Sequence, residues 1–187
     1  MSFIKYLVQR GGFRSILTGS LLGVELEGID SLPVYNVSAP VAPLLVGEQR
    51  NLFKLFYLDT GMLMSSYSKK VARGVFDGAA EGSFAMNMGA AYEGFVAQEL
   101  KAHGFRLRYF TSKKIGELDF VEETLGGDVL AIEVKSGGRY KSHAALDNAL
   151  AAKGYGIDRA LVLAETNLFR DGDVLYLPTF MVGLLEP

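Results

Sequence analysis

Two short stretches, Gly116-Glu117-Leu118-Asp119-Phe120 and Ile132-Glu133-Val134-Lys135-Ser136, decide the expected fold. Both alternate apolar and ionisable side chains, which is the period-two pattern of a half-buried β-strand. In the first stretch this alternation predicts the two acids on one face and the leucine and phenylalanine on the other. In the second, the acid and the lysine are expected to share a face. Two adjacent strands of this kind would gather three carboxylates and one ammonium group over an apolar sheet.

Such a polar patch is suited to binding a divalent cation. Carboxylate oxygens are ligands for hard divalent ions, and a neighbouring lysine can orient water or stabilise negative charge. The chain has no cysteine and only two histidines, His103 and His143. Thiolate zinc sites are therefore excluded, and an imidazole-based metal site is disfavoured. The sequence predicts Mg²⁺ or Mn²⁺ as the cofactor.

The composition is that of a globular protein. With 187 residues, of which 49% are apolar and 21% charged, the chain is long enough for one domain with a substantial core. No apolar run approaches the ~20 residues of a membrane helix. The first residues lack the basic region and long apolar core of a signal peptide. We therefore expect a cytoplasmic protein with no membrane partner.

The order of expected elements defines the fold class. Helical periodicity is clearest from Ala85 to His103, where Gly104 supplies a C-terminal stop. Three strands should follow, at 106–111, 117–123 and 129–136, and then a helix at 142–153 and a strand at 159–164. This is an α/β fold with a mixed β-sheet flanked by helices. The earlier segment from Gly28 to Pro43 contains three prolines and is expected to be an extended loop or linker.

Basic residues cluster beside the two strand motifs. Between Lys101 and Lys114 there are five cations and no acid, and three more cations lie between Lys135 and Lys141. A charge cluster of this kind is most often a solvated face. A track for a phosphate backbone is the functional alternative. On that alternative, the candidate nucleic-acid-binding residues are Lys113, Lys114, Arg139 and Lys141.

The two motifs resemble those of the PD-(D/E)xK nuclease superfamily, in which an acid is followed, after a hairpin, by Asp/Glu-x-Lys. The resemblance implies a restriction-endonuclease-like core with the order αβββαβ. It places Glu93 as the helix acid, Asp119 and Glu133 as metal ligands, and Lys135 as the motif lysine. These four residues form the candidate catalytic set of a metal-dependent nuclease, with DNA as the expected substrate. Either motif alone also occurs on ordinary solvated sheet faces.

The chain also resembles a narrower family, the DUF4143 domain found at the C-terminal end of many bacterial and archaeal AAA-type ATPases. The matching segments are Phe53–Leu63, Tyr92–Leu100, Gly116–Val121 and Ile132–Gly137. Residues 15–26 resemble the strand near the end of the ATPase domain in such proteins. The resemblance implies that residues 1–50 are a remnant of an ATPase domain plus a linker, and that residues 51–187 form the nuclease-like domain. No Gly-x₄-Gly-Lys-Ser/Thr loop occurs in the sequence, so we expect neither an ATP site nor ATPase activity.

Two functions remain open at this point. The domain is either a divalent-metal-dependent nuclease or a catalytically inactive module that binds nucleic acid or a protein partner. Self-association through residues 1–50 is a further expectation, because a partial domain would leave apolar surface uncovered.

Overall fold

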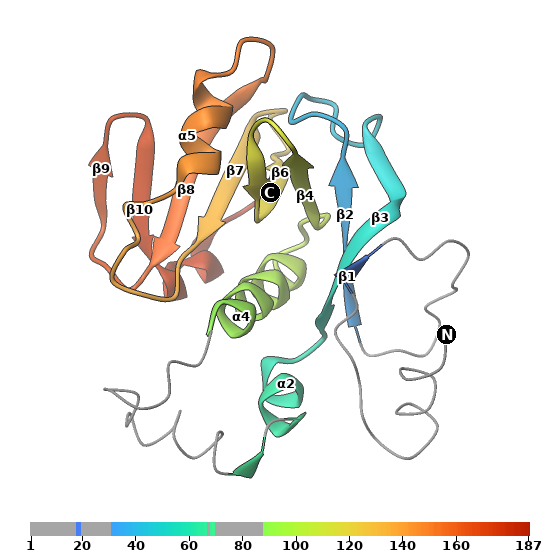
Figure 1. Cartoon of the computed structure of the whole chain (residues 1–187), viewed down its shortest axis with the longest axis vertical. Coiled ribbons are helices and arrows are strands. Elements are labelled where there is room, and N and C mark those ends of the chain that lie inside the picture. Colours follow the sequence, from blue (N-terminus) through green and yellow to red (C-terminus); the bar gives the residue numbers. More distant parts are fainter. Residues whose placement is uncertain (1–17, 20–30, 67, 70–87) are drawn as a thin grey trace.

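The computed structural model describes residues 18–19, 31–66, 68–69 and 88–187. Most of the segment 15–26, and the first residues of the helix expected from Ala85, lie outside the described residues. The assignment of residues 1–50 to an ATPase remnant stays a prediction. Figure 1 shows the described elements with the labels used below.

The first of two sheets contains five strands in the order β1-β3-β2-β4-β5. In chain order these are β1 (Thr18–Gly19), β2 (Ser31–Val37), β3 (Glu48–Tyr57), β4 (Arg108–Ser112) and β5 (Gly116–Leu118). Strand β2 is antiparallel to β3 and parallel to β4, so the sheet is mixed.

The second sheet also contains five strands, in the order β6-β7-β8-β10-β9. These are β6 (Phe120–Glu123), β7 (Val129–Val134), β8 (Ile157–Ala164), β9 (Phe169–Asp171) and β10 (Val174–Pro178). Strands β7, β8 and β10 are mutually parallel, whereas β6 and β9 are antiparallel to their neighbours. The carboxyl ends of three parallel strands therefore meet at one edge of this sheet.

Helices cover the sheets and close two hydrophobic cores. The helices are α2 (Thr60–Ser66), α4 (Gly89–Ala102), α5 (Ala144–Ala151) and the 3₁₀ helix η1 (Thr179–Leu184). Val96 and Leu100 of α4 belong to a first core cluster, which includes residues of both sheets. Leu146 and Ala149 of α5 belong to a second cluster, which also includes residues of both sheets. Figure 1 shows α5 beside β7 and β8, and α4 next to β3.

Several sequence expectations are confirmed. The mixed α/β class and the order helix, strands, helix, strand from α4 to β8 agree with the prediction. Helix α4 ends at the expected place, where Gly104 has φ 91°, a conformation that favours glycine. Strand β8 is buried from Ala160 to Ala164 and lies between β7 and β10, as its apolar run predicts. Within the described residues, no helix is both long and apolar enough to span a membrane.

The predicted single strand at 117–123 is wrong. The chain bends at Asp119, so β5 belongs to the first sheet and β6 to the second. The predicted alternation of faces fails at the same place, since Leu118 packs in the second core cluster and Phe120 in the first. One residue of bend shifts which face the following side chains occupy.

The segment expected to be an irregular loop also differs. Ser31–Val37 forms β2, with Leu32, Val34 and Asn36 buried on alternate positions. Pro33 is accommodated because it pairs with Leu55 of β3, while the pairing with β4 begins only at Tyr35. The missing N–H of the proline therefore faces no partner strand. The loop prediction holds from Ser38 to Pro43, after β2, while residues 28–30 lie outside the described residues.

Candidate functional site

The hairpin of β6 and β7 brings the two predicted metal ligands together. Phe120 pairs with Ile132 and Val121 with Ala131, so the same register extended by one residue puts Asp119 opposite Glu133. The backbone N–H of Val134 donates a hydrogen bond to Asp119 Oδ2 at 2.8 Å. The bend at Asp119 thus ends the pairing with β4 and fixes the carboxylate against the end of β7.

The motif lysine lies directly against the motif glutamate. Lys135 Nζ is 2.6 Å from Glu133 Oε1, in a hydrogen-bonded ion pair. Glu133 is only 6% exposed, and its second oxygen, Oε2, has no hydrogen-bond partner among the described residues. The backbone N–H of Lys135 donates to the carbonyl of Leu163 at 2.8 Å, which holds the residue at the end of β7. Glu133 therefore has one oxygen held by Lys135 and one that no described residue satisfies.

A second lysine, Lys54 of β3, was not identified from the sequence. Its Nζ is 2.5 Å from Glu117 Oε1, and its side chain is 13% exposed. The same ammonium lies 4.9 Å from the centre of the Tyr109 ring, within the range of a cation–π contact. A lysine in the apolar run from Phe53 to Tyr57 was the available signal, because a charge at a core strand position needs a partner.

The charges of these residues act on one another. Burial, with the nearby Asp119 charge, raises the pKa of Glu93 to about 7. Burial and the Glu133 charge raise the pKa of Asp119 to about 7. Burial also raises the pKa of Glu133, although its bond to Lys135 opposes that shift.

Lys54 responds in the complementary way. Burial lowers its pKa, but the hydrogen bond and charge of Glu117, together with Asp119 and Glu93, outweigh burial and raise the pKa. We call this set, formed by Lys54, Glu93, Glu117, Asp119, Glu133 and Lys135, the carboxylate cluster. The structure therefore brings Glu93, Asp119, Glu133 and Lys135 into one electrostatic unit and adds Lys54 and Glu117 to it.

The predicted nucleic-acid-binding residues are all exposed. Lys113 and Lys114 lie in the turn from β4 to β5, while Arg139 and Lys141 lie in the connection from β7 to α5. Lys141 is 3.9 Å from the exposed Asp171 and lies over the ring of Phe169. The two pairs thus come from separate segments, and the second pair follows Lys135 directly.

The arrangement offers a partial set of metal ligands. Among the residues that the structure describes, no group of three or more acids or histidines has the geometry of a complete metal site. Asp119 and Glu133 nevertheless supply hard oxygen donors from opposing positions, and Glu133 Oε2 is buried without a partner in the described parts of the chain. Two carboxylates, with water and substrate oxygens completing the shell, are a usual ligand set for Mg²⁺. The residues present therefore fit a divalent cation chemically.

Comparisons with known proteins identify a domain but not an activity. No curated protein and no solved structure matches the chain. A family model described as "Domain of unknown function (DUF4143)" matches residues 88–180. This range includes α4, Glu117, the β6–β7 hairpin and Lys135, but not Lys54, since β3 precedes it. The part of the chain from α4 into η1 is thus similar to the DUF4143 domain, and the family description names no function.

Proposed function

We propose that this domain is a divalent-metal-dependent nuclease that hydrolyses phosphodiester bonds, with DNA as its substrate. The observation that supports this proposal is the meeting of Asp119 and Glu133 at the β6–β7 hairpin, with Lys135 on Glu133 and Glu93 within electrostatic reach. The same residues are those that the PD-(D/E)xK resemblance implies. Buried carboxylates with raised pKa values in one cluster are typical of functional sites.

Asp119 and Glu133 would hold the cation. A bound Mg²⁺ or Mn²⁺ would polarise the phosphate and lower the pKa of a coordinated water. Asp119 is preoriented for this role by the N–H of Val134, and Glu133 by Lys135. Substrate positioning and charge stabilisation are the main contributions that a protein makes to phosphoryl transfer.

The remaining residues act on the water and the phosphate. Water attacks phosphorus, the bond from phosphorus to the leaving oxygen breaks, and the water proton passes to a base. Glu93 is the carboxylate placed to accept that proton, and a solvent water returns a proton to the leaving oxygen. Lys135 stabilises the charge that develops on the phosphate oxygens. Arg139 and Lys141, which follow it in the chain, bind the flanking backbone phosphates.

The direct test is cleavage of labelled single-stranded and duplex DNA with Mg²⁺ or Mn²⁺. Wild type should cleave, whereas Asp119→Ala and Lys135→Ala should abolish cleavage and leave the circular dichroism spectrum unchanged. Retained cleavage in either variant would refute the proposal. Removing the cation with EDTA should stop the reaction, and Mg²⁺ should restore it.

A non-catalytic binding module is the second candidate, and a specific observation favours it. Both lysines of the carboxylate cluster are already paired with acids, Lys54 with Glu117 and Lys135 with Glu133. A cluster whose lysines are already neutralised by acids can serve as a polar surface that binds nucleic acid or a protein partner. On this proposal the domain is a binding module attached to an AAA-type ATPase. This function predicts that Lys113→Ala and Arg139→Ala weaken DNA binding more than Asp119→Asn does. The reverse ranking would exclude a nucleic-acid-binding role of this kind.

A further inference from the structure

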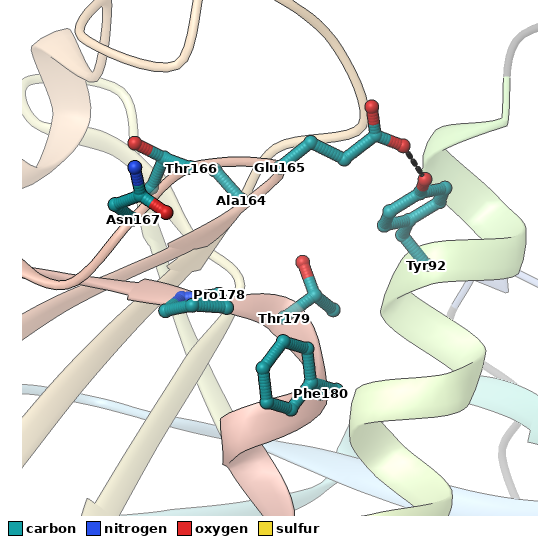
Figure 2. A pocket seen from close by; sticks show the side chains of 8 residues that line it. All are labelled: Tyr92, Ala164, Glu165, Thr166, Asn167, Pro178, Thr179 and Phe180. Atoms are coloured by element: carbon teal, nitrogen blue, oxygen red, sulfur yellow. Dashed lines mark hydrogen bonds between the residues drawn. The ribbon is translucent and has the colours of Figure 1, made fainter.

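A cavity of about 560 Å³ opens at the carboxyl ends of β8 and β10. Figure 2 shows the eight residues that line it. They come from three elements: Tyr92 from α4; Ala164, Glu165, Thr166 and Asn167 from the end of β8; and Pro178, Thr179 and Phe180 from the end of β10 and the start of η1. In parallel sheets, ligands bind outside the carboxyl ends of the strands.

Residues that line this cavity are close in the chain to members of the carboxylate cluster or to their strand partners. Tyr92 immediately precedes Glu93 on α4, so the two side chains leave the same turn of the helix. Val134 pairs with Leu163, and the N–H of Lys135 donates to the carbonyl of Leu163. Leu163 therefore holds Lys135 in place, and Glu165, two residues after Leu163, lines the cavity.

The chemistry of the lining excludes a phosphate and fits a planar polar ring. None of the eight described lining residues is a lysine, arginine or histidine, and the one charged residue is Glu165. Phe180 is 75% exposed, an unusual position for a large apolar ring. Asn167 and Thr166 supply hydrogen-bonding groups from the opposite side of the cavity to Tyr92 (Figure 2).

One polar group of the cavity lacks a hydrogen-bond partner, and a pair of other polar groups fixes the rim. The hydroxyl of Thr179 points into the space between Asn167 and Tyr92 (Figure 2), and its Oγ1 is buried with no hydrogen-bond partner in the described part of the chain. The hydroxyl of Tyr92 donates to Glu165 across 73 residues of sequence, which fixes the carboxylate at the rim. A carboxylate held in this way accepts hydrogen bonds from an amine and repels an anion.

We propose that this cavity is a subsite for one unstacked nucleobase carrying an exocyclic amine, such as cytosine or adenine, next to the phosphate handled by the carboxylate cluster. The base stacks on Phe180, its amine donates to Glu165, and its ring atoms bond Thr179 and Asn167. The size of the cavity lies within the usual range for small-molecule sites. This subsite rests on the proposed nuclease function for its neighbour, and it implies a preference for single-stranded or locally opened DNA.

The test measures binding separately from cleavage. Fluorescence anisotropy with labelled 12-nucleotide dC, dA and dT oligomers in EDTA reports binding alone. Phe180→Ala should weaken binding of the dC and dA oligomers about tenfold, within the range measured for base–aromatic stacking. Leu184→Ala is the matched control, because Leu184 is an exposed apolar residue of the same 3₁₀ helix that does not line the cavity. Leu184→Ala should change the affinity less than about twofold, compared with about tenfold for loss of a stacking residue.

Two further variants probe the polar groups. Thr179→Val keeps the shape but removes the hydroxyl, and it should weaken binding of dC and dA. Glu165→Gln should reduce the preference for dC and dA over dT, because the amide also donates. Equal binding of all three oligomers by wild type, or an unchanged affinity in Phe180→Ala, would refute the subsite.

The outcome is distinguishable from a failure of the nuclease proposal. If wild type cleaves DNA while Phe180→Ala binds normally, the subsite is wrong and the nuclease stands. If Phe180→Ala weakens binding while wild type cleaves no DNA, the base subsite is supported, the nuclease proposal is wrong, and the domain is a binding module.

Discussion

Two groups of buried carboxylates lie in the described part of the fold, and they differ in the charges around them. In the carboxylate cluster, the charge of one acid raises the pKa of another, so that Asp119 acts on Glu93, Glu133 on Asp119 and Glu93 on Glu133. Among the described residues, one buried oxygen of Glu133 and one of Glu122, in the other group, lack a hydrogen-bond partner, so an unpaired oxygen does not distinguish the two groups. The other group, which we call the arginine network, consists of Glu48, Arg108, Glu122 and their partners. There Arg108 lies 3.2 Å from Glu48, and both side chains are 5% exposed or less.

Glu122 shows why a raised pKa alone does not identify a site. It is fully buried, and burial raises its pKa well above the usual value despite a hydrogen bond from the Arg108 N–H at 3.0 Å. No second acid is among the residues that shift its pKa, since Arg108 and Lys101 are the charges that act on it. Glu122 thus serves the packing of β4 against β6, whereas the carboxylate cluster gathers several acids. The convergence of acids, and not burial, marks the functional candidate.

The same substitution at both buried glutamates should have the largest difference in effect. Glu133→Gln should reduce DNA cleavage at least about 100-fold, because loss of a residue that only supports a metal ligand already costs 10–100-fold. Glu122→Gln should change cleavage less than about threefold, since Glu122 contacts no part of the proposed site. Initial rates at saturating Mg²⁺ provide the measurement. Equal losses in both variants would show that the two groups do not differ in function.

The next largest effect concerns stability and belongs to the arginine network. Arg108→Ala should lower the free energy of unfolding by about 3 kcal/mol, because it leaves the buried Glu48 without the Arg108 guanidinium as a partner. The truncated side chain also leaves a cavity. Arg50, 3.0 Å from Glu48, keeps the loss at the lower end of the expected range.

Arg106→Ala is the matched control for this prediction. Arg106 also faces Glu48, but at 3.8 Å and with 56% of its side chain exposed, so it should cost no more than about 1 kcal/mol. Urea unfolding of the three proteins compares them directly. A similar loss of unfolding free energy in both variants would mean that the buried Arg108–Glu48 pair stabilises the fold no more than the exposed Arg106–Glu48 pair.

Metal binding should depend on pH in the carboxylate cluster. The pKa of Asp119 is about 7, so below that pH a cation must displace its proton. The affinity for Mn²⁺ should therefore fall roughly tenfold for each pH unit below 7 and become nearly constant above pH 8. Calorimetry at pH 6, 7 and 8, in buffers of different ionisation enthalpy, measures both the affinity and the proton release. An affinity that does not change between pH 6 and pH 8 would contradict the raised pKa.

The smallest expected effect is a change in the pH dependence of stability at Glu122. Its pKa is higher in the folded than in the unfolded chain, so the folded state binds the proton more tightly. Its contribution to stability is thus lost as the pH rises from the unfolded pKa of about 4.3 through the folded value. Glu122→Gln cannot titrate, so the gap between variant and wild type should move in favour of the variant from pH 4 to pH 8. A constant gap in urea unfolding across this range would contradict the shift.

The local elements could be predicted from sequence because their signals are local. Helix α4 has periodic apolar residues and a glycine stop, and β8 has an uninterrupted apolar run. The order of acids and lysine likewise places Asp119, Glu133 and Lys135 on neighbouring strands. These are properties of residues close together in the chain.

The missed features depend on contacts between distant segments. Pro33 reads as a loop residue until the short pairing of β2 with β4 is known. The bend at Asp119 gives no sequence signal, because acids and apolar residues alternate regularly through it. In the structure, however, Leu118 and Phe120 pack in different core clusters. Lys54 and Glu117 are far apart in sequence and meet through the order of strands in the first sheet, whereas Tyr92 and Glu165 meet through the position of α4 beside the end of β8.

Titration of Mn²⁺ into wild type, Asp119→Asn and Glu122→Gln at pH 7.5 would decide whether the carboxylate cluster binds a cation, because it requires no assumption about substrate. Saturable binding to wild type and Glu122→Gln, lost in Asp119→Asn, is the result predicted if the carboxylate cluster is a metal centre. Binding that survives in Asp119→Asn would contradict that assignment. No binding to wild type at millimolar Mn²⁺, with and without a DNA oligomer, would contradict it as well and favour the non-catalytic module.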